Sequence, residues 1–292
     1  MGIADVRRFN RTVTQRIGAL NDAYMSRDRP LGQARVLWEI GPDGCDVRAL
    51  RARLDLDSGY LSRLLRVLEN DGLVEVKQSG DDGRVRIARL TEHGRTERAV
   101  LDQRSDELAE SILDPLSERQ RQRLITAMGE VERLLIASTV QIGIVDPRRP
   151  EAKFCVQSYF EELGTRFDGG FDQARTISAD VDELTLPAGL LLVATLHAEP
   201  VGCGGLKFHA GEPAEVKRMW VSPDVRGLGL GRRLLTELEK QASARGTAVL
   251  RLETNRSLTE AIALYRAAGY VEVEAFNDEP YAHHWFEKRL AE

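Results

Sequence analysis

The hydrophobic rhythm of this 292-residue chain changes near residue 139, and that change limits the folds open to it more than any other feature. Before this point, apolar residues recur every three or four positions, the spacing of helices with one buried face. After it, short strand-like runs alternate with helical stretches, which is an α/β pattern. We therefore predict two domains, a mostly helical one at residues 1–138 and an α/β one at residues 139–292.

The first segment has the element order of a winged helix-turn-helix domain. Its expected elements are helices at 5–22, 32–40, 47–54 and 58–70, a hairpin of strands at 73–77 and 85–90, and helices at 92–113 and 118–137. Asp46 is expected to cap the third helix and either Asp57 or Ser58 the fourth, because short polar side chains accept hydrogen bonds from the first free amides.

The helix at 58–70 is the expected recognition helix, because its amino-terminal end carries polar side chains suited to base edges in the major groove. The tip of the hairpin lies where an arginine reaches a narrow minor groove. The residues expected to contact DNA are Ser58, Tyr60, Arg63, Arg66 and Arg84. The alternative is that Arg84 pairs with a neighbouring aspartate and that the helix arginines are only solvated.

The hairpin and the helix after it carry the motif Asp82-x-Arg84 followed by Leu90-Thr91-x-x-Gly94. With this motif, residues 5–137 resemble the MarR family of transcriptional regulators. The resemblance implies double-stranded DNA as a partner and a homodimer built by the first and last helices, here residues 6–20 and 116–136.

The most informative motif of the second segment is a glycine-rich turn that follows a strand and opens a helix. Its residues are Arg226, Gly227, Leu228, Gly229, Leu230, Gly231 and Arg232. Glycines let several backbone N–H groups approach a diphosphate at the positive end of a helix. The order of the glycines differs from Gly-x-Gly-x-x-Gly, and no Lys-Ser/Thr pair follows, so dinucleotide and nucleoside triphosphate loops are disfavoured.

A second motif follows, with Asn255, Ala261, Leu264-Tyr265 and Gly269-Tyr270. Together the two motifs make residues 139–292 resemble the GNAT superfamily of acetyl-CoA-dependent N-acetyltransferases. The resemblance implies a mixed sheet with two splayed strands and acetyl-CoA as cofactor. It further implies that the backbone of Met219 and Val221 holds the pantetheine, that 226–232 holds the diphosphate, and that Asn255 contacts the cofactor from the far side of the splay.

Direct transfer to an amine needs a base for the amine and an acid for the leaving thiolate. Glu215 is expected to share a face with Val221, six residues later on one strand, and is the candidate base. Tyr265 is at the family position of the acid. The alternatives are that Glu215 only pairs with Lys217 or Arg218 and that Tyr265 is a core residue.

The residues after the first strand of this domain are expected to form the acceptor wall, by the same resemblance. They include Tyr159, Arg166 and Phe167, with Phe160, Asp168 and Phe171 nearby. An arginine in a small pocket suits an acceptor that carries a carboxylate, such as an amino acid. The pair His283-His284 is not expected to bind a metal, because adjacent strand residues face opposite ways.

These observations predict a bifunctional protein, a DNA-binding regulator joined to an N-acetyltransferase that acts on a small amine. One alternative is a regulator whose second domain only senses acetyl-CoA or a metabolite, and another is an enzyme whose winged helix only dimerises. Three widely spaced cysteines and the lack of any ~18-residue apolar run favour the cytoplasm over a membrane or secreted location. The net charge of −5 means that DNA contacts must come from arginines gathered on one face.

Overall fold

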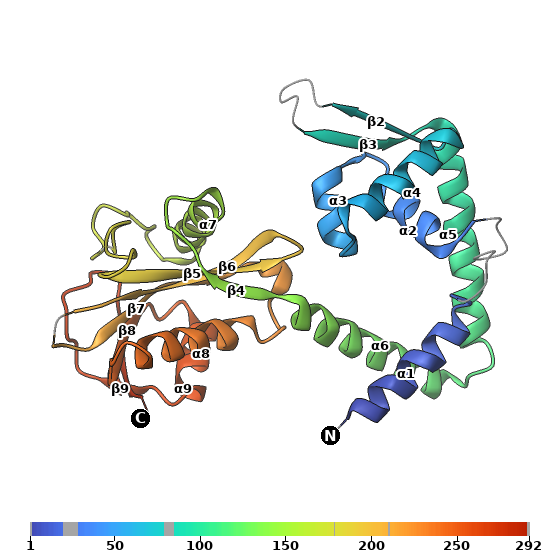
Figure 1. Ribbon diagram of the computed structural model, residues 1–292. Coiled ribbons are helices and arrows are strands. Elements are labelled where there is room, and N and C mark those ends of the chain that lie inside the picture. Colours follow the sequence, from blue (N-terminus) through green and yellow to red (C-terminus); the bar gives the residue numbers. More distant parts are fainter. Residues whose placement is uncertain (1, 20–28, 79–84, 178, 210, 291–292) are drawn as a thin grey trace. The chain divides into compact units, whose positions relative to one another are not determined.

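The computed structural model describes residues 2–19, 29–78, 85–177, 179–209 and 211–290 (Figure 1). Contacts within the chain divide it into two compact units, Met1–Gly129 and Glu130–Glu292. This division falls inside helix α6 (Glu118–Thr139), earlier than the boundary predicted at residue 138. Each unit is described by itself.

The first unit contains helices and a small antiparallel sheet in the predicted order. Its elements before α6 are α1 (Ile3–Arg16), α2 (Leu31–Ile40), β1 (Cys45–Asp46), α3 (Val47–Leu54), α4 (Ser58–Asn70), β2 (Val74–Gln78), β3 (Arg86–Leu90) and α5 (Glu92–Leu113). The sheet order is β1-β3-β2. Strand β1 was not predicted, because two residues are too few to show an alternating pattern.

Side-chain caps fix where several of these helices begin. Asp46 accepts hydrogen bonds from the backbone N–H of Arg48 at 2.6 Å and of Ala49 at 3.0 Å. Asp57, rather than Ser58, caps α4 by accepting from Tyr60 N–H at 2.8 Å. These bonds satisfy amides that have no acceptor within the helix.

The Leu90-Thr91-x-x-Gly94 motif ties helix α5 to the chain that enters the hairpin. The Thr91 hydroxyl accepts from Gly94 N–H at 2.9 Å and donates to the Gly72 carbonyl oxygen at 2.7 Å. A Cβ atom at Gly94 would lie 2.0 Å from the Leu73 carbonyl oxygen, so no larger residue fits there. The motif is therefore a packing requirement of this winged domain.

The second unit contains a seven-stranded sheet with helices on both faces (Figure 1). Its elements after α6 are β4 (Gln141–Ile144), α7 (Pro150–Arg166), β5 (Gly189–Leu196), β6 (Glu199–Lys207), β7 (Ala214–Val221), α8 (Leu230–Ser243), β8 (Val249–Thr254), α9 (Thr259–Ala267), β9 (Val271–Val273) and β10 (His284–Arg289). The strand order is β4-β5-β6-β7-β8-β10-β9, and only the β7–β8 pair is parallel. The predicted mixed sheet is confirmed. Among the described residues, no helix is long and apolar enough to cross a membrane.

The two central strands separate after a short paired stretch. Strands β7 and β8 pair only at Ala214 with Leu250 and at Glu215 with Arg251, within the part of the chain that is described. Both strands then continue to Val221 and Thr254 without further pairing to each other, while β7 stays paired with β6 and β8 with β10. The predicted splay is therefore present, and it leaves the edge of β7 that faces β8 without a neighbouring strand.

A β-bulge in β7 shifts the alternation of its side chains between the α7 side and the α8 side of the sheet. Cys203 of β6 pairs with Trp220, whereas Gly205 pairs with Lys217, so β7 has one extra residue between these pairs. Arg218, in this bulge, has φ +55°, a left-handed conformation that is unusual for a residue with a side chain. The prediction that Glu215 shares a face with Val221 is therefore wrong. Val221 packs toward α8, whereas Glu215 lies on the α7 side with Lys217.

Candidate functional site

Two cavities lie in the second unit where β7 and β8 separate. One, of about 520 Å³, is lined by the glycine-rich turn and is called the loop cavity here. The other, of about 90 Å³, is lined in part by a group of aromatic rings and is called the aromatic cavity. The residues that line both are Tyr159, Leu163, Met219, Leu258, Ala261 and Tyr265. The two cavities therefore adjoin, and Met219 and Tyr265 stand at their junction.

The loop cavity ends at the amino terminus of α8, whose first amides have no acceptor within the helix. Gly227 and Gly229 have φ +80° and +73°, a conformation that glycine adopts without strain. Gly229 is the N-cap of α8 and supplies no side-chain hydrogen bond. Leu228 and Leu230 pack against the core, which holds the turn in place.

Gly231 keeps the first turn of α8 open to the loop cavity. A Cβ atom at this position would lie 3.3 Å from Leu264 Cδ2 and 3.9 Å from Val221 Cγ2. Arg232 follows, exposed, on the lining of the same cavity. Unsatisfied amides, the positive end of a helix and a nearby guanidinium are the chemistry that binds a diphosphate. The residues present therefore fit the cofactor implied by the sequence.

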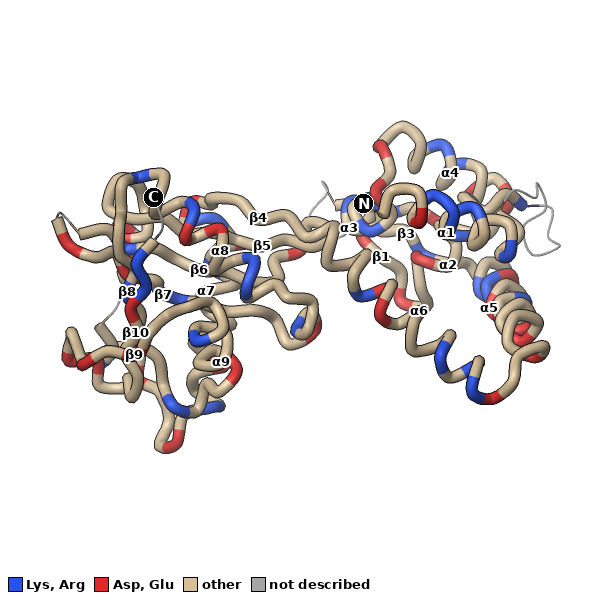
Figure 2. The backbone as a smooth tube through the Cα atoms, turned by 90° about the horizontal axis from the view of Figure 1, so that it is seen from below, with Lys and Arg blue, Asp and Glu red and all other residues tan. Residues whose placement is uncertain are grey.

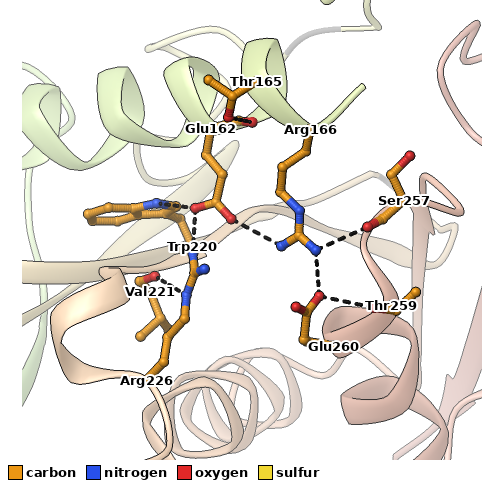
Figure 3. Close-up of polar contacts among 9 residues, drawn as sticks. All are labelled: Glu162, Thr165, Arg166, Trp220, Val221, Arg226, Ser257, Thr259 and Glu260. Carbon is orange, nitrogen blue, oxygen red and sulfur yellow. Dashed lines mark hydrogen bonds and ion pairs between the residues drawn. The ribbon is translucent and has the colours of Figure 1, made fainter. Parts of the chain in front are cut away.

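A network of charged side chains borders the loop cavity (Figure 3). Glu162 of α7 accepts hydrogen bonds from Trp220 Nε1 at 3.0 Å and from the guanidinium groups of Arg226 and Arg166. Arg226 Nε also donates to the Val221 carbonyl oxygen at 3.1 Å. Thus Arg226 occupies a backbone acceptor of β7 that was predicted to bind the cofactor.

Arg166 belongs to the same network. Besides its ion pair with Glu162, it pairs with Glu260 at 2.6 Å and donates to the Ser257 carbonyl oxygen at 3.0 Å. It lines the loop cavity and is absent from the described lining of the aromatic cavity. Arg166 therefore lines the loop cavity and Phe167 the aromatic cavity, although both were predicted to contact the acceptor.

The aromatic cavity is walled by rings that touch one another. Phe171 stacks on Phe160 with centroids 5.7 Å apart, and it meets Tyr281 at 4.9 Å and Phe167 at 5.7 Å. Tyr159 lines the same cavity. Tyr159 and Phe167 were predicted on this wall, whereas Tyr281 comes from the loop before β10 and had no signal in the sequence.

Glu253 is the carboxylate of the aromatic cavity that the sequence prediction missed. It lies on β8 and bonds to Lys217 Nζ through Oε1. Its Oε2 is buried and has no hydrogen-bond partner among the described residues. Burial raises the pKa of Glu253, and the attraction of Lys217 only partly opposes this. A carboxylate with a free oxygen and a raised pKa is equipped to accept a proton.

Glu215, the predicted base, lies on the far side of Lys217. Its carboxylate pairs with Lys217 Nζ at 2.7 Å and with His209 Nε2 at 3.1 Å. Burial alone would raise the pKa of Glu215, but Lys217 and the other nearby cations lower it. Glu215 is not among the described residues that line either cavity, whereas Lys217, on the same face of β7, lines the aromatic cavity.

Tyr265 and Asn255 come from the second motif. Tyr265 is buried at the junction of the cavities, and burial raises the pKa of its phenol, with smaller effects from Tyr159 and Glu253. Asn255 donates to the Tyr281 carbonyl oxygen at 2.7 Å and accepts from Ser257 N–H at 2.9 Å. Among the described lining residues, Asn255 belongs to the aromatic cavity and not to the loop cavity.

In the first unit, α4 presents the predicted polar face. Leu61, Leu64, Leu65 and Leu68 are buried, whereas Ser58, Tyr60, Arg63 and Arg66 are exposed. Arg63 lies 5.6 Å from the centre of the Tyr60 ring. Figure 2 marks basic residues along this helix. Arg84, the predicted wing contact, lies outside the described residues.

Comparison with known proteins gives a family for each part. The Acetyltransferase (GNAT) family matches residues 156–270, and the MarR family matches residues 28–85. An IAA acetyltransferase of Azospirillum brasilense is 42% identical over 94 residues, which are 32% of this chain and 61% of that protein. The match therefore spans less than two thirds of that relative.

An uncharacterized N-acetyltransferase of Schizosaccharomyces pombe is 30% identical over 132 residues, 44% of this chain and 79% of that protein. A solved GNAT-family acetyltransferase from Staphylococcus aureus is 18% identical and has a TM-score of 0.44, with 52% of this chain and 100% of that one covered. With the glycine loop, the splay and the family matches in agreement, the chain belongs to the GNAT family of acetyltransferases and carries a MarR-family domain before that part.

Proposed function

We propose that this protein is a DNA-binding regulator and an acetyl-CoA-dependent N-acetyltransferase of a small amine. The observation that carries the enzymatic half is the junction of the loop cavity with the aromatic cavity at Met219 and Tyr265. One cavity suits a long anionic donor and the other a small acceptor, so the reacting groups would meet at this junction. Proximity of this kind is a large part of catalysis.

The residues of the loop cavity would hold the donor, and acetyl-CoA when bound supplies an activated acetyl thioester. The amides at the start of α8, with Arg226 and Arg232, would bind the diphosphate. The edge of β7 that faces β8, from Met219 to Val221, would bind the pantetheine arm, once Arg226 has released the Val221 carbonyl oxygen.

Glu253 is the proposed general base, because its free Oε2 lies in the wall of the aromatic cavity. It would accept a proton from the acceptor ammonium. Glu215 then acts through Lys217 as a positioning residue, since both carboxylates bond to that ammonium group. Tyr265 would keep its proton at neutral pH and hold it at the junction for a departing thiolate.

The first unit is proposed to bind double-stranded DNA as a homodimer. The exposed face of α4 would enter the major groove. Apolar side chains stand exposed on α1, with Val6 57% and Phe9 46% accessible, and on α6, with Ile125 50% and Met128 52% accessible. A second copy of the chain would cover them. A cytoplasmic location suits both DNA and acetyl-CoA.

The enzymatic proposal is tested by thiol release from acetyl-CoA, measured with purified full-length protein and a panel of small amines. Turnover of at least one amine is expected. Saturable binding of acetyl-CoA without any thiol release would instead favour a sensor.

The DNA-binding proposal is tested by the fluorescence anisotropy of labelled double-stranded DNA fragments that the wild-type protein binds. Dimerisation is tested by analytical sedimentation of the protein. Arg63→Gln is expected to weaken DNA binding by roughly tenfold, the usual loss for one arginine contact, and to leave acetyl-CoA binding unchanged. Equal binding by the wild type and this variant would contradict the assignment of α4.

A further inference from the structure

The aromatic cavity contains a second charged group besides Glu253. Arg218 lines it from β7, where its guanidinium lies 4.3 Å from the centre of the Phe160 ring and donates to the Ala179 carbonyl oxygen at 3.0 Å. The bulge in β7 brings it there, since φ +55° at Arg218 turns the side chain out of the regular alternation. Strained conformations of this kind are kept where they serve a site.

Arg218 and Glu253 both act on the Tyr159 side chain of the cavity. The Tyr159 hydroxyl is influenced electrostatically by both, with Arg218 lowering and Glu253 raising its pKa, while burial raises it most. Burial also lowers the pKa of the Arg218 guanidinium. A cation that has lost much of its water favours a bound anion more strongly than an exposed one does.

The other carboxylate of the cavity, Glu279, is already committed to the loops around it. It accepts hydrogen bonds from the Thr176 hydroxyl at 2.8 Å and from Ile177 N–H at 2.6 Å through Oε2, and from Tyr281 N–H through Oε1. Lys217 is likewise held between Glu215 and Glu253. Glu253 and Arg218 line the same cavity, together with the rings of Phe160, Phe167 and Phe171.

From this arrangement we infer that the acceptor is an amino acid with an apolar side chain, whose carboxylate binds Arg218 while its amino group faces Glu253. This rests on the proposed function and adds its substrate class. The amine forms the new C–N bond as the C–S bond of the donor breaks, and its proton passes to Glu253. The rings of Phe167 and Phe171 contact the side chain.

The test compares each amino acid with the amine that lacks only the carboxylate. Phenylalanine is paired with phenethylamine and leucine with isoamylamine, and rates of thiol release are compared at equal concentrations of free base. The inference predicts that kcat/KM is at least about tenfold higher for the amino acid in each pair, since a buried charge left unpaired is costly. Equal rates, or faster acetylation of the simple amines, would overturn it.

Variants of Arg218 sharpen the test. Arg218→Gln is expected to lower kcat/KM for phenylalanine at least about tenfold more than for phenethylamine, and Arg218→Lys to restore part of the preference. Arg251→Gln is the matched control, because Arg251 pairs with Glu287 and is outside the described lining of the cavity. An equal loss for both acceptors would show that Arg218 is only structural. The wild-type comparison stands even if the variants fold poorly.

Calorimetry with coenzyme A bound separates this inference from the proposed function. Binding of phenylalanine but not of phenethylamine, without turnover, would keep the inference and overturn the enzymatic proposal. Turnover of amines without any preference for the carboxylate would keep the enzymatic proposal and overturn the inference. A failure to bind either acceptor would overturn the inference, and the panel of amines would still decide the enzymatic proposal.

Discussion

The loop cavity and the aromatic cavity adjoin and share several lining residues, yet only the loop cavity includes the glycine-rich turn. Six residues that line the loop cavity come from one continuous segment, 226–232, at the start of α8, and others come from α7, β7 and α9. The aromatic cavity is made of side chains from α7, from the irregular chain after it, and from β7, β8, α9 and the loop before β10. Backbone amides bind an anion largely independently of the neighbouring side chains, whereas the side chains of the aromatic cavity determine which acceptor fits.

This difference separates the two halves of the proposed reaction. Substitutions in the aromatic cavity should change the chemical step or the choice of acceptor and leave the donor affinity alone. Substitutions in the loop cavity should change the donor affinity and leave the chemical step and the choice of acceptor alone. Each prediction below tests that separation.

The largest effect is expected from Glu253→Gln, which removes the proposed base and keeps the shape of the side chain. It should lower kcat by about 10²–10⁴-fold, the usual contribution of general base catalysis, with acetyl-CoA affinity unchanged. Glu215→Gln is the matched control on the other side of Lys217 and should lose less than about tenfold, since it acts only by positioning. If kcat falls more in Glu215→Gln than in Glu253→Gln, Glu215 and not Glu253 is the base.

The same residue predicts the pH dependence. Burial raises the pKa of Glu253 above its ordinary value of 4.5, and the base works only when it is unprotonated. The kcat of the wild type should therefore fall as the pH drops through this raised pKa, and the fall should be absent in Glu253→Gln. A profile of kcat against pH that is the same for both proteins would count against this role.

The next largest effect is expected from Gly231→Leu, which fills the entrance between Val221 and Leu264. Acetyl-CoA should bind at least about tenfold more weakly by calorimetry, because added bulk blocks the approach of the ligand to the helix amides. Gly164→Leu is the control, since a Cβ atom at Gly164 of α7 meets nothing within 4 Å. Equal affinity in the two variants would mean that the donor binds elsewhere.

The smallest effect is expected from Glu162→Gln. This change removes a negative charge beside the loop cavity and weakens the hold on Arg226. Acetyl-CoA should bind about threefold more tightly at low salt, and the gain should shrink as salt rises. Weaker binding would show instead that Glu162 is needed to orient Arg226 toward the donor.

The same contrast explains how much of the site the sequence could predict. The elements of the fold were predicted closely, because caps, glycine breaks and hydrophobic spacing are local signals, and Asp46 and Gly229 are examples. The loop cavity was predicted for the same reason. Glu253, Arg218 and Tyr281 were missed, because their meeting depends on a bulge and on the pairing of strands far apart in the chain.

The error over Glu215 has one identifiable cause. Alternation along β7 predicts that residues 215 and 221 share a face, and a single extra residue at Arg218 reverses this. A φ of +55° in a non-glycine residue leaves no mark in composition or hydrophobic pattern. The exposed polar face of α4 was predictable for the opposite reason, since its leucines follow the helical period throughout.

The central claim is that main-chain amides at residues 226–232 bind the diphosphate of the acyl donor, and it is tested most directly by calorimetry with two donors. Acetyl-CoA contains the diphosphate, and S-acetylpantetheine presents the same thioester and arm without it. Acetyl-CoA is predicted to bind at least about a hundredfold more tightly, or about 2.7 kcal/mol, as expected when several charge-assisted hydrogen bonds are lost. Equal affinity for the two donors would contradict the claim.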